Sequence, residues 1–211
     1  MRRQMSGPQR PEGFRHLEGY LSPIEQAALL AGVHAVLAEA PLYAPVMPRT
    51  GKPLSVAMSN CGSLGWVTDK DGGYRYQPLH PVTGRPWPPI PAVLMTLWRD
   101  LASYPYPPEA CLINYYGGSA RMGQHRDIDE QDLAAPVLSV SLGDDAVFSL
   151  GGLTRKDPRE RIVLQSGDVV VLGGAARLAY HGIDKVLAGS SDLLAEGGRI
   201  NLTLRRVRSA E

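Results

Sequence analysis

Arg199-Ile200-Asn201-Leu202-Thr203-Leu204-Arg205, close to the end of the chain, alternates strictly between polar and apolar residues. Successive side chains of a β-strand point to opposite faces, so this period of two predicts a strand with one polar and one apolar face. The polar face of an isolated strand is usually solvated. If the strand instead lines the inside of a folded sheet, its two arginines point into a cavity.

Short segments with the same period continue upstream to residue 110, and glycines separate them. Many short strands punctuated by glycine are typical of a β-sandwich or barrel. We therefore expect an α+β, mainly β, protein whose core, residues 110–207, is a double-stranded β-helix, or jelly roll. The expected strands are 111–116, 137–142, 146–150, 161–165, 169–172 and 200–207.

Two helices are predicted to flank this core. Ser22-Pro23-Ile24-Glu25 forms a capping box with proline at the first helical position, and Leu30, Val33 and Leu37 supply the buried stripe that follows. A second helix is expected over residues 91–103, where apolar residues recur at helical spacing. Both helices should pack against the sheet.

The remaining segments are less regular. Residues 41–90 are dense in proline and glycine, with short strand-like pieces such as 55–58, and irregular segments of this kind often carry binding surfaces. We expect this segment to carry a binding surface on a single domain, 13–211. Residues 1–12 lack apolar periodicity and are expected to be a flexible tail.

Composition limits the function classes. A chain of 211 residues with 44% hydrophobic and 20% charged residues is typical of one ordinary globular domain. The net charge of +1 provides no overall basic field, so a nucleic-acid partner would need a local patch. Cys61 and Cys111 form no C-x-x-C motif, and no apolar run has signal-peptide or membrane-span length. These features predict a cytoplasmic protein with free thiols and no membrane segment.

His125-x-Asp127 and the distant His181 form the candidate metal site. An isolated H-x-D is usually a surface turn, but residues two apart on an extended segment point the same way, and the glycine in Tyr180-His181-Gly182 permits close backbone approach. Two imidazoles and one carboxylate suit non-haem Fe(II), because three adjacent coordination positions stay open. The other histidines are expected to be surface or structural residues: His16, His34 and His80.

Arg199 and Arg205 on the alternating strand add a second requirement. A guanidinium group binds a carboxylate through two parallel hydrogen bonds, which lysine cannot do. Two arginines close to iron would therefore suit a small dicarboxylate as co-substrate.

An ordered series of motifs extends over nearly the whole chain: Asn60-Cys61-Gly62-x-Leu64-Gly65-Trp66, Leu112-Ile113-Asn114-x-Tyr116, His125-x-Asp127-x-Asp129-Glu130, Ser139-Val140-Ser141-Leu142-Gly143, Gly151-Gly152-Leu153-x-Arg155, Gly167-Asp168-Val169-Val170-Val171, Tyr180-His181-Gly182 and Arg199-x-Asn201-Leu202-Thr203-x-Arg205. From about residue 13 to 207 the chain thereby resembles the AlkB family of Fe(II)- and 2-oxoglutarate-dependent dioxygenases, most closely the bacterial alkylated-DNA repair branch. The resemblance implies a jelly roll with an N-terminal nucleotide-recognition lid, residues 41–90, that recognises the substrate.

The resemblance also implies residue roles. His125, Asp127 and His181 would bind iron. Arg199 would hold the distal carboxylate of 2-oxoglutarate. The other expected co-substrate residues are Tyr116 and Asn201 beside Arg199, and Asn114 and Arg205 near the chelating end.

On the substrate side, the resemblance implies that Trp66 and the His125 ring sandwich a flipped base and that Asp129 receives its exocyclic amino group. Trp66 could equally be a core aromatic residue. Tyr74 and Tyr76 are expected to be exposed and to contact the strand. Arg155 would bind phosphates, although a solvated basic turn is nearly as good an interpretation.

The implied reaction uses O2 and 2-oxoglutarate to hydroxylate a methyl group on a base of the 1-methyladenine or 3-methylcytosine type, releasing formaldehyde, succinate and CO2. Single-stranded DNA is the expected substrate of a monomeric enzyme, and RNA stays open as a second one. Two alternatives are a hydroxylase or demethylase with the same chemistry acting on protein or a small molecule, and a jelly-roll binding module without catalysis.

Overall fold

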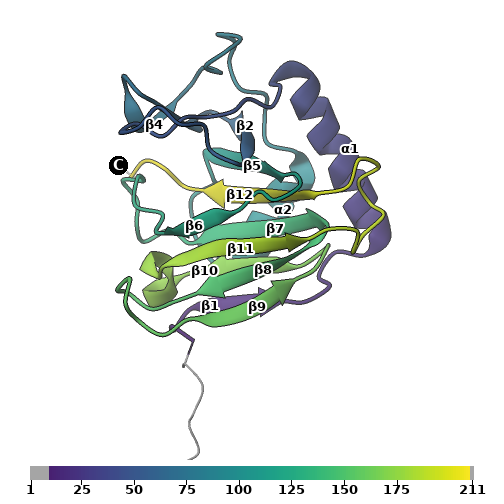
Figure 1. Cartoon of the computed structure of the whole chain (residues 1–211), viewed down its shortest axis with the longest axis vertical. Helices are drawn as coiled ribbons and strands as arrows, with labels where there is room; N and C mark the ends of the chain where they lie inside the picture. The colour runs from purple at the N-terminus through teal and green to yellow at the C-terminus, as the bar shows by residue number, and fades with distance from the viewer. Residues whose placement is uncertain (1–9, 210–211) are drawn as a thin grey trace, which may run out of the picture.

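The computed structural model describes residues 10–209 (Figure 1). Its largest element is a six-stranded antiparallel sheet with the strands, in spatial order, β1 (Phe14–Leu17), β10 (Val169–Leu172), β7 (Val137–Gly143), β12 (Arg199–Arg205), β5 (Ala110–Tyr116) and β2 (Ala57–Gly62). A second, four-stranded antiparallel sheet contains β6 (Met122–His125), β11 (His181–Leu187), β8 (Asp145–Leu150) and β9 (Glu160–Leu164). The two sheets form the expected jelly roll.

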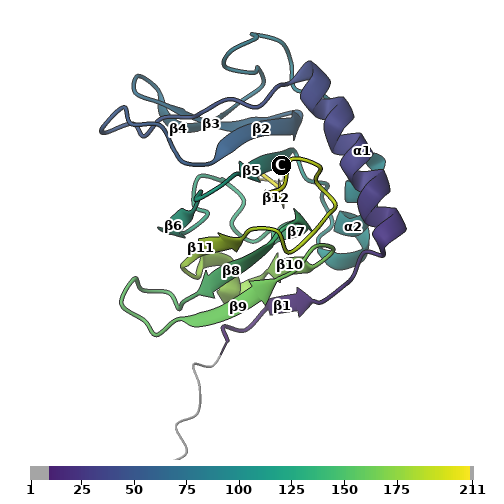
Figure 2. The same cartoon turned by 45° about the vertical axis from the view of Figure 1, so that its right-hand side comes forward.

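Two helices cover the face of the six-stranded sheet that points away from the four-stranded one (Figures 1 and 2). Helix α1 (Pro23–Glu39) begins with the predicted capping box of Ser22 and Glu25, and α2 (Ala92–Leu101) lies within the predicted range. The buried side chains of both helices pack against Ile200, Leu202 and Leu204 of β12 in one apolar cluster. The apolar half of the alternating segment therefore faces the helices, and its polar half faces the space between the sheets.

All six predicted strands of the core are present within one or two residues of their expected bounds. Strands β1, β6 and β11 were not predicted. Met122–His125 and His181–Leu187 contain glycine, histidine and charged residues instead of a clear apolar alternation, so their strand conformation depends on pairing with each other. Gly182 permits this pairing, because a Cβ atom there would lie 2.6 Å from the Met122 carbonyl oxygen.

The expected lid, residues 41–90, is more regular than its composition suggests. It contains β2, which joins the large sheet, and a hairpin of β3 (Gly65–Asp69) and β4 (Gly73–Gln77). The strand-like piece expected at 55–58 begins at Ala57. The hairpin lies beyond the β2 edge of the sheet (Figure 2).

The expected flexible tail falls mainly on residues 1–9, which lie outside the described residues. Residues 10–12 are ordered by contacts with the core: Arg10 pairs with Glu160 at 2.9 Å, and the Glu12 carbonyl accepts a hydrogen bond from Ala176. In residues 10–209, no helix combines the length and apolar character that crossing a membrane requires.

The cysteines and spare histidines behave as predicted. Cys61 and Cys111 are buried, free and opposite each other on β2 and β5. Among the histidines, His34 is exposed, whereas the rings of His16 and His80 are held in partly buried hydrogen bonds.

Candidate metal and co-substrate site

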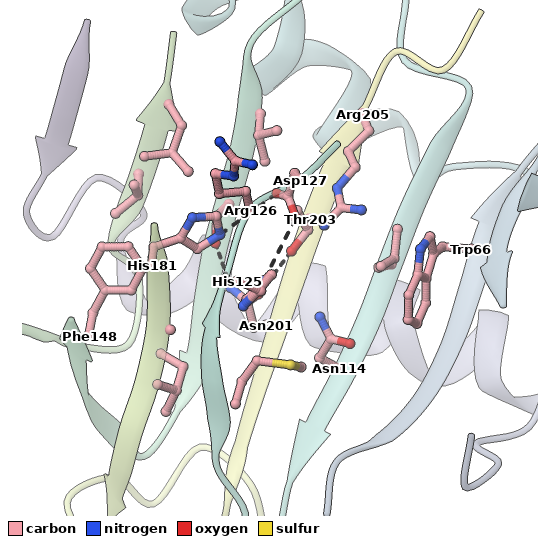
Figure 3. Close-up of a pocket in the computed structure, with 18 of the residues that line it drawn as sticks. Trp66, Asn114, His125, Arg126, Asp127, Phe148, His181, Asn201, Thr203 and Arg205 are labelled. Carbon is pink, nitrogen blue, oxygen red and sulfur yellow. Dashed lines mark hydrogen bonds and ion pairs between the residues drawn. The ribbon is translucent and has the colours of Figure 1, made fainter. Parts of the chain in front are cut away.

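His125, Asp127 and His181 come together at one end of the small sheet (Figure 3). His125 is the last residue of β6 and His181 the first residue of β11, and the two are paired across the strands. One Asp127 oxygen lies 3.7 Å from His125 Nε2, and the other lies 3.8 Å from His181 Nε2. The candidate ligand atoms all lie within 4.8 Å of one another, so a single metal ion can bind all three.

Backbone carbonyls orient both imidazoles. His125 Nδ1 lies 2.9 Å from the Gly123 carbonyl oxygen, and His181 Nδ1 lies 3.0 Å from that of Ala179. Because a carbonyl oxygen only accepts hydrogen bonds, each Nδ1 carries the proton and each Nε2 keeps its lone pair for a metal.

Burial and neighbouring charges set the protonation states that a metal requires. Burial, together with the nearby His125, lowers the pKa of His181 to about 4, so its ring is neutral near pH 7. Burial alone would raise the pKa of Asp127, but the positive charges of Arg205 and Arg177 hold it well below its usual range. One buried oxygen of Asp127 has no hydrogen-bond partner. Two imidazoles with free Nε2 atoms and one carboxylate fit an Fe(II) ion with open positions.

Arg205 belongs to a buried ion-pair network behind the triad. It donates hydrogen bonds to Asp127 at 2.8 Å, to the Tyr76 hydroxyl at 3.0 Å and to Glu130 at 3.1 Å. Arg177 donates to the other Glu130 oxygen and to the Asp127 carbonyl. This network fixes the Asp127 carboxylate beside the imidazoles, and Arg205 keeps one unpartnered donor, Nε.

Arg199 differs because most of its donors have no partner. The residue is 1% exposed, and only Nη2 is bonded, to Ser141 at 2.9 Å, whereas Nε and Nη1 have no partner within the described chain. Its guanidinium lies 5.4 Å from the centre of the Tyr116 ring. Burial raises the pKa of Tyr116 to about 12, so its hydroxyl is a neutral donor at pH 7. A buried cation with free donors beside a phenol is suited to a carboxylate ligand.

The two asparagine side chains expected at the co-substrate site, Asn114 and Asn201, differ in whether their amide groups already have hydrogen-bond partners. Asn114 Oδ1 is buried without a partner, so it is free to contact a ligand. The Asn201 side chain already donates to Ser139 and the Val140 carbonyl and accepts from Thr203. Asn201 therefore lines the site and organises its wall.

A cavity of about 420 Å³ lies between the sheets and the lid. Its wall includes every residue expected from the sequence to bind iron, co-substrate or substrate, except Tyr76. The candidate iron ligands, the free donors of Arg199 and the rings of Trp66 and Tyr74 thus open into one chamber.

The aromatic residues of the lid close one side of this chamber. The rings of Trp66 and Tyr74 stack 5.5 Å apart at 19°, and Trp66 Nε1 donates to Asp129 at 2.7 Å. Tyr74 is 55% exposed, as expected. The expected exposure of Tyr76 is wrong: it is partly buried, and its hydroxyl is bonded to Glu130 and Arg205. It points inward because Tyr76 and Trp66 form a pair across the β3–β4 hairpin that packs on the core.

The sequence alone indicates no role for Arg126, Tyr180, Glu130 or Arg177. Arg126 and Tyr180 line the cavity, and Arg155 lies beside them with its guanidinium 5.3 Å from the Tyr180 ring centre. The sequence could have pointed to Arg126 and Tyr180 only through their positions: Arg126 lies between two candidate metal ligands, and Tyr180 directly precedes the third.

Comparisons with known proteins agree with this geometry. The model of the 2OG-Fe(II) oxygenase superfamily matches residues 13–205. The chain is 52% identical to an alpha-ketoglutarate-dependent dioxygenase AlkB homolog of Caulobacter vibrioides, covering 94% of this chain and 89% of that protein. It is 45% identical to the alpha-ketoglutarate-dependent dioxygenase AlkB of Escherichia coli, covering 87% and 85%. The solved structure of OsALKBH1 superimposes with a TM-score of 0.80 at 28% identity, covering 94% of this chain and 98% of that one.

Two relatives that match a smaller part of the chain have names that state a substrate. One is the DNA N(6)-methyladenine demethylase ALKBH1A of Arabidopsis thaliana, 35% identical over 56% of this chain and 41% of that protein. Another is the tRNA demethylase abh1 of Schizosaccharomyces pombe, 32% identical over 47% of this chain and 37% of that protein. The family match, the identities to AlkB proteins and the His-Asp-His cluster lead to one conclusion: the chain is an Fe(II)- and 2-oxoglutarate-dependent dioxygenase and belongs to the AlkB family.

Proposed function

We propose that the protein removes methyl groups oxidatively from N-alkylated bases, of the 1-methyladenine and 3-methylcytosine type, in single-stranded DNA. RNA is proposed as a second substrate, since one relative is named a tRNA demethylase. The observation that carries the proposal is the shared cavity, in which the candidate iron ligands face an aromatic lid. A flat methylated base is the substrate chemistry that such a cavity would accept.

The iron would be held by Nε2 of His125, Nε2 of His181 and the carboxylate of Asp127. When bound, iron together with 2-oxoglutarate and O2 supplies the oxidation that hydroxylates the methyl carbon, with succinate and CO2 as co-products. The protein's part is to fix the ligands through their Nδ1 hydrogen bonds and through Arg205.

Arg199 would bind the distal carboxylate of 2-oxoglutarate. Its unpartnered Nε and Nη1 offer the parallel donors that a carboxylate accepts, and the neutral Tyr116 hydroxyl adds a third. Asn114 and the free Nε of Arg205 would lie toward the end of the co-substrate that meets the metal, and Asn201 would shape the wall.

Trp66 and Tyr74 would hold the base. A base methylated at a ring nitrogen is cationic and stacks favourably on electron-rich rings, and the His125 ring would lie on its other side. Asp129 would release Trp66 Nε1 and accept the exocyclic amino group instead. Tyr76 would act through Arg205, because its hydroxyl is already bonded inside the protein.

The base must leave its stack to reach an enclosed cavity, and this costs least in single strands. We therefore propose a preference for single-stranded nucleic acid. The proposal also describes a monomer in the cytoplasm, where the buried thiols of Cys61 and Cys111 would stay reduced.

The test is turnover with Fe(II), ascorbate, 2-oxoglutarate and oligonucleotides that carry 1-methyladenine or 3-methylcytosine, as DNA and as RNA. Formaldehyde release and loss of the methyl group by mass spectrometry are expected, faster for single strands than for duplexes. Succinate formation with every oligonucleotide left methylated would favour a protein or small-molecule substrate. No succinate under any condition would instead indicate a binding module.

A further inference from the structure

Arg177 holds the irregular loop 126–136, which connects β6 to β7 and carries the candidate metal ligand Asp127. The arginine belongs to the 3-10 helix η1 (Gly174–Leu178) and is 2% exposed. Its Nε donates to the Ala135 carbonyl oxygen at 2.8 Å, Nη1 donates to the Asp127 carbonyl oxygen at 2.6 Å, and Nη2 donates to the Glu130 carboxylate at 2.9 Å. All three nitrogen atoms of one guanidinium group are therefore bonded to this loop.

The loop has little other support from its own backbone. Within residues 10–209, no two backbone groups of 126–136 are hydrogen-bonded to each other, and the amides of Gln131 and Asp132 donate to the Val207 carbonyl. A buried backbone carbonyl without a partner costs free energy. Arg177 supplies the partners at both ends of the loop, Asp127 and Ala135, and so takes the place of the hydrogen bonds that a helix or sheet would provide.

Arg177 also joins two segments that carry metal ligands. It lies on the segment that leads to His181, where the Ala179 carbonyl orients the imidazole. The hydrogen bond from Arg177 to the Asp127 carbonyl therefore connects the backbone of one ligand to the segment that ends at another. His125 and His181 are connected separately, through the pairing of β6 with β11.

Two arginines hold Asp127 at different atoms. Arg205, on β12, donates to the carboxylate at 2.8 Å (Figure 3), whereas Arg177 donates to the main-chain carbonyl. The first contact sets the direction of the side chain, and the second sets the position of the backbone from which it extends. The described wall of the cavity does not include Arg177, so its effect on a bound metal would pass through Asp127.

The contacts of Arg177 require arginine itself. The buried group contains two guanidinium groups, Arg177 and Arg205, and two carboxylates, Asp127 and Glu130, so its charges balance. Lysine would keep this balance. All the donors of lysine leave from one nitrogen atom, however, so it cannot copy the planar fork that reaches three separate acceptors.

We propose that Arg177 is a positioning residue for the metal site: by holding the main chain of Asp127 against the segment that leads to His181, it raises the affinity for the metal without contacting it. Partners of this kind typically change metal affinity by about 10- to 100-fold. The proposal concerns the metal centre alone and is the same for any substrate that the enzyme oxidises.

The test is titration of the full chain with Co(II) alone, followed by its visible absorption, without 2-oxoglutarate or oligonucleotide. Arg177→Lys is expected to raise Kd for Co(II) by about 10- to 100-fold, and Arg177→Met by at least as much. Arg161→Met is the matched control, because Arg161 also donates to a carboxylate, Asp184 at 2.9 Å, but is 74% exposed. Its Kd should stay within about twofold of wild type, as expected for a surface change.

Two further variants separate positioning from general stability. Leu94→Ala removes a fully buried side chain of α2, so it weakens the fold without touching the loop, and it should keep the wild-type Kd. The Arg177→Met/Glu130→Gln double variant removes the carboxylate charge that Arg177→Met leaves unpaired, and it should fold where the single variant does not. Its Kd should be raised as in Arg177→Lys.

Hydrogen exchange of Arg177→Lys without metal locates the effect. The amides of 126–136 should exchange faster than in wild type, whereas those of β12 should be unchanged. A wild-type Kd for Co(II) in folded Arg177→Lys and in the double variant would overturn the proposal. So would an equal rise of Kd in Leu94→Ala, since metal affinity would then follow overall stability instead of the position of Asp127.

Discussion

His125 and His181 show how much of the candidate metal site is set by single hydrogen bonds. Each ring is fixed by one backbone carbonyl at Nδ1, and burial keeps His181 neutral near pH 7. Neither feature needs a metal to be present. The site is thus preorganised, so that iron binding requires little rearrangement of the protein.

We predict that His125→Ala abolishes turnover without unfolding the chain. His125 is partly exposed at the end of a short strand, so removing its ring leaves no large cavity in the core. Formaldehyde release should fall to background, and the midpoint of thermal unfolding without metal should change by less than about 3 °C, since surface changes cost about 0.5 kcal/mol or less. Full demethylation by this variant would contradict its assignment as an iron ligand.

Arg199→Met should separate co-substrate binding from stability. Loss of a bidentate contact worth about 3 kcal/mol should raise KM for 2-oxoglutarate about 100-fold. The ligand-free variant should nevertheless be as stable as wild type or more stable, because a buried cation with two unpartnered donors is replaced by an apolar side chain. Titration of KM, together with urea unfolding without ligand, checks both parts. Unfolding at a much lower urea concentration would show that Arg199 is mainly structural.

The β3–β4 hairpin connects the substrate side of the cavity with the triad. Its outer residue Tyr74 stacks on Trp66, and its inner residue Tyr76 is bonded to Arg205, which in turn holds Asp127. Movement of the hairpin would therefore shift the Asp127 carboxylate, because the Tyr76–Arg205 and Arg205–Asp127 hydrogen bonds connect the two.

Trp66→Ala should weaken use of the substrate more than use of 2-oxoglutarate. Base–aromatic stacking is worth about 1–3 kcal/mol, so KM for a methylated oligonucleotide should rise by about 5- to 100-fold. KM for 2-oxoglutarate should stay within about twofold, because Trp66 contacts Tyr74 and Asp129, which are expected to bind the base. Equal effects on both constants would indicate that Trp66 is a core residue, the alternative that the sequence left open.

Tyr76→Phe tests the inner contact of the hairpin. It removes one hydroxyl from the Arg205–Glu130 network, and the expected loss in the free energy of unfolding is about 1 kcal/mol. Tyr74→Phe, at an exposed ring whose hydroxyl has no such partners, is the matched control and should be neutral. Urea denaturation of both variants makes the comparison, and equal stability would remove Tyr76 from the network.

At the scale of the whole molecule, β12 separates the apolar core under the helices from the polar cavity between the sheets. Leu202 is fully buried among the side chains of the helices, while its neighbours on the strand face the cavity. Leu202→Ala should therefore lower the free energy of unfolding by about 2–5 kcal/mol. Val163→Ala, at a 47% exposed position on β9, should change it by about 0.5 kcal/mol or less. Similar losses in both variants would contradict this description of the core.

The sequence by itself determined six strands of the core, both helices and most of the polar and aromatic residues expected to bind metal, co-substrate or substrate. Strict alternation over residues 199–205 and the capping box at Ser22 are local signals, and local signals can be read without the fold. Motifs far apart in the chain matched one family in order, which added the candidate iron and co-substrate residues.

Only the tertiary structure decided which of these residues keep free donors. Arg199 and Arg205 look equivalent in the sequence, yet Arg205 is bonded to Asp127, Tyr76 and Glu130, whereas two nitrogens of Arg199 are unpartnered. Tyr76 turns inward, where its hydroxyl is bonded to Glu130 and Arg205. Hydrogen-bond partners and stacking contacts come from segments far apart in the chain, and their distances exist only once the two sheets and the lid have packed together.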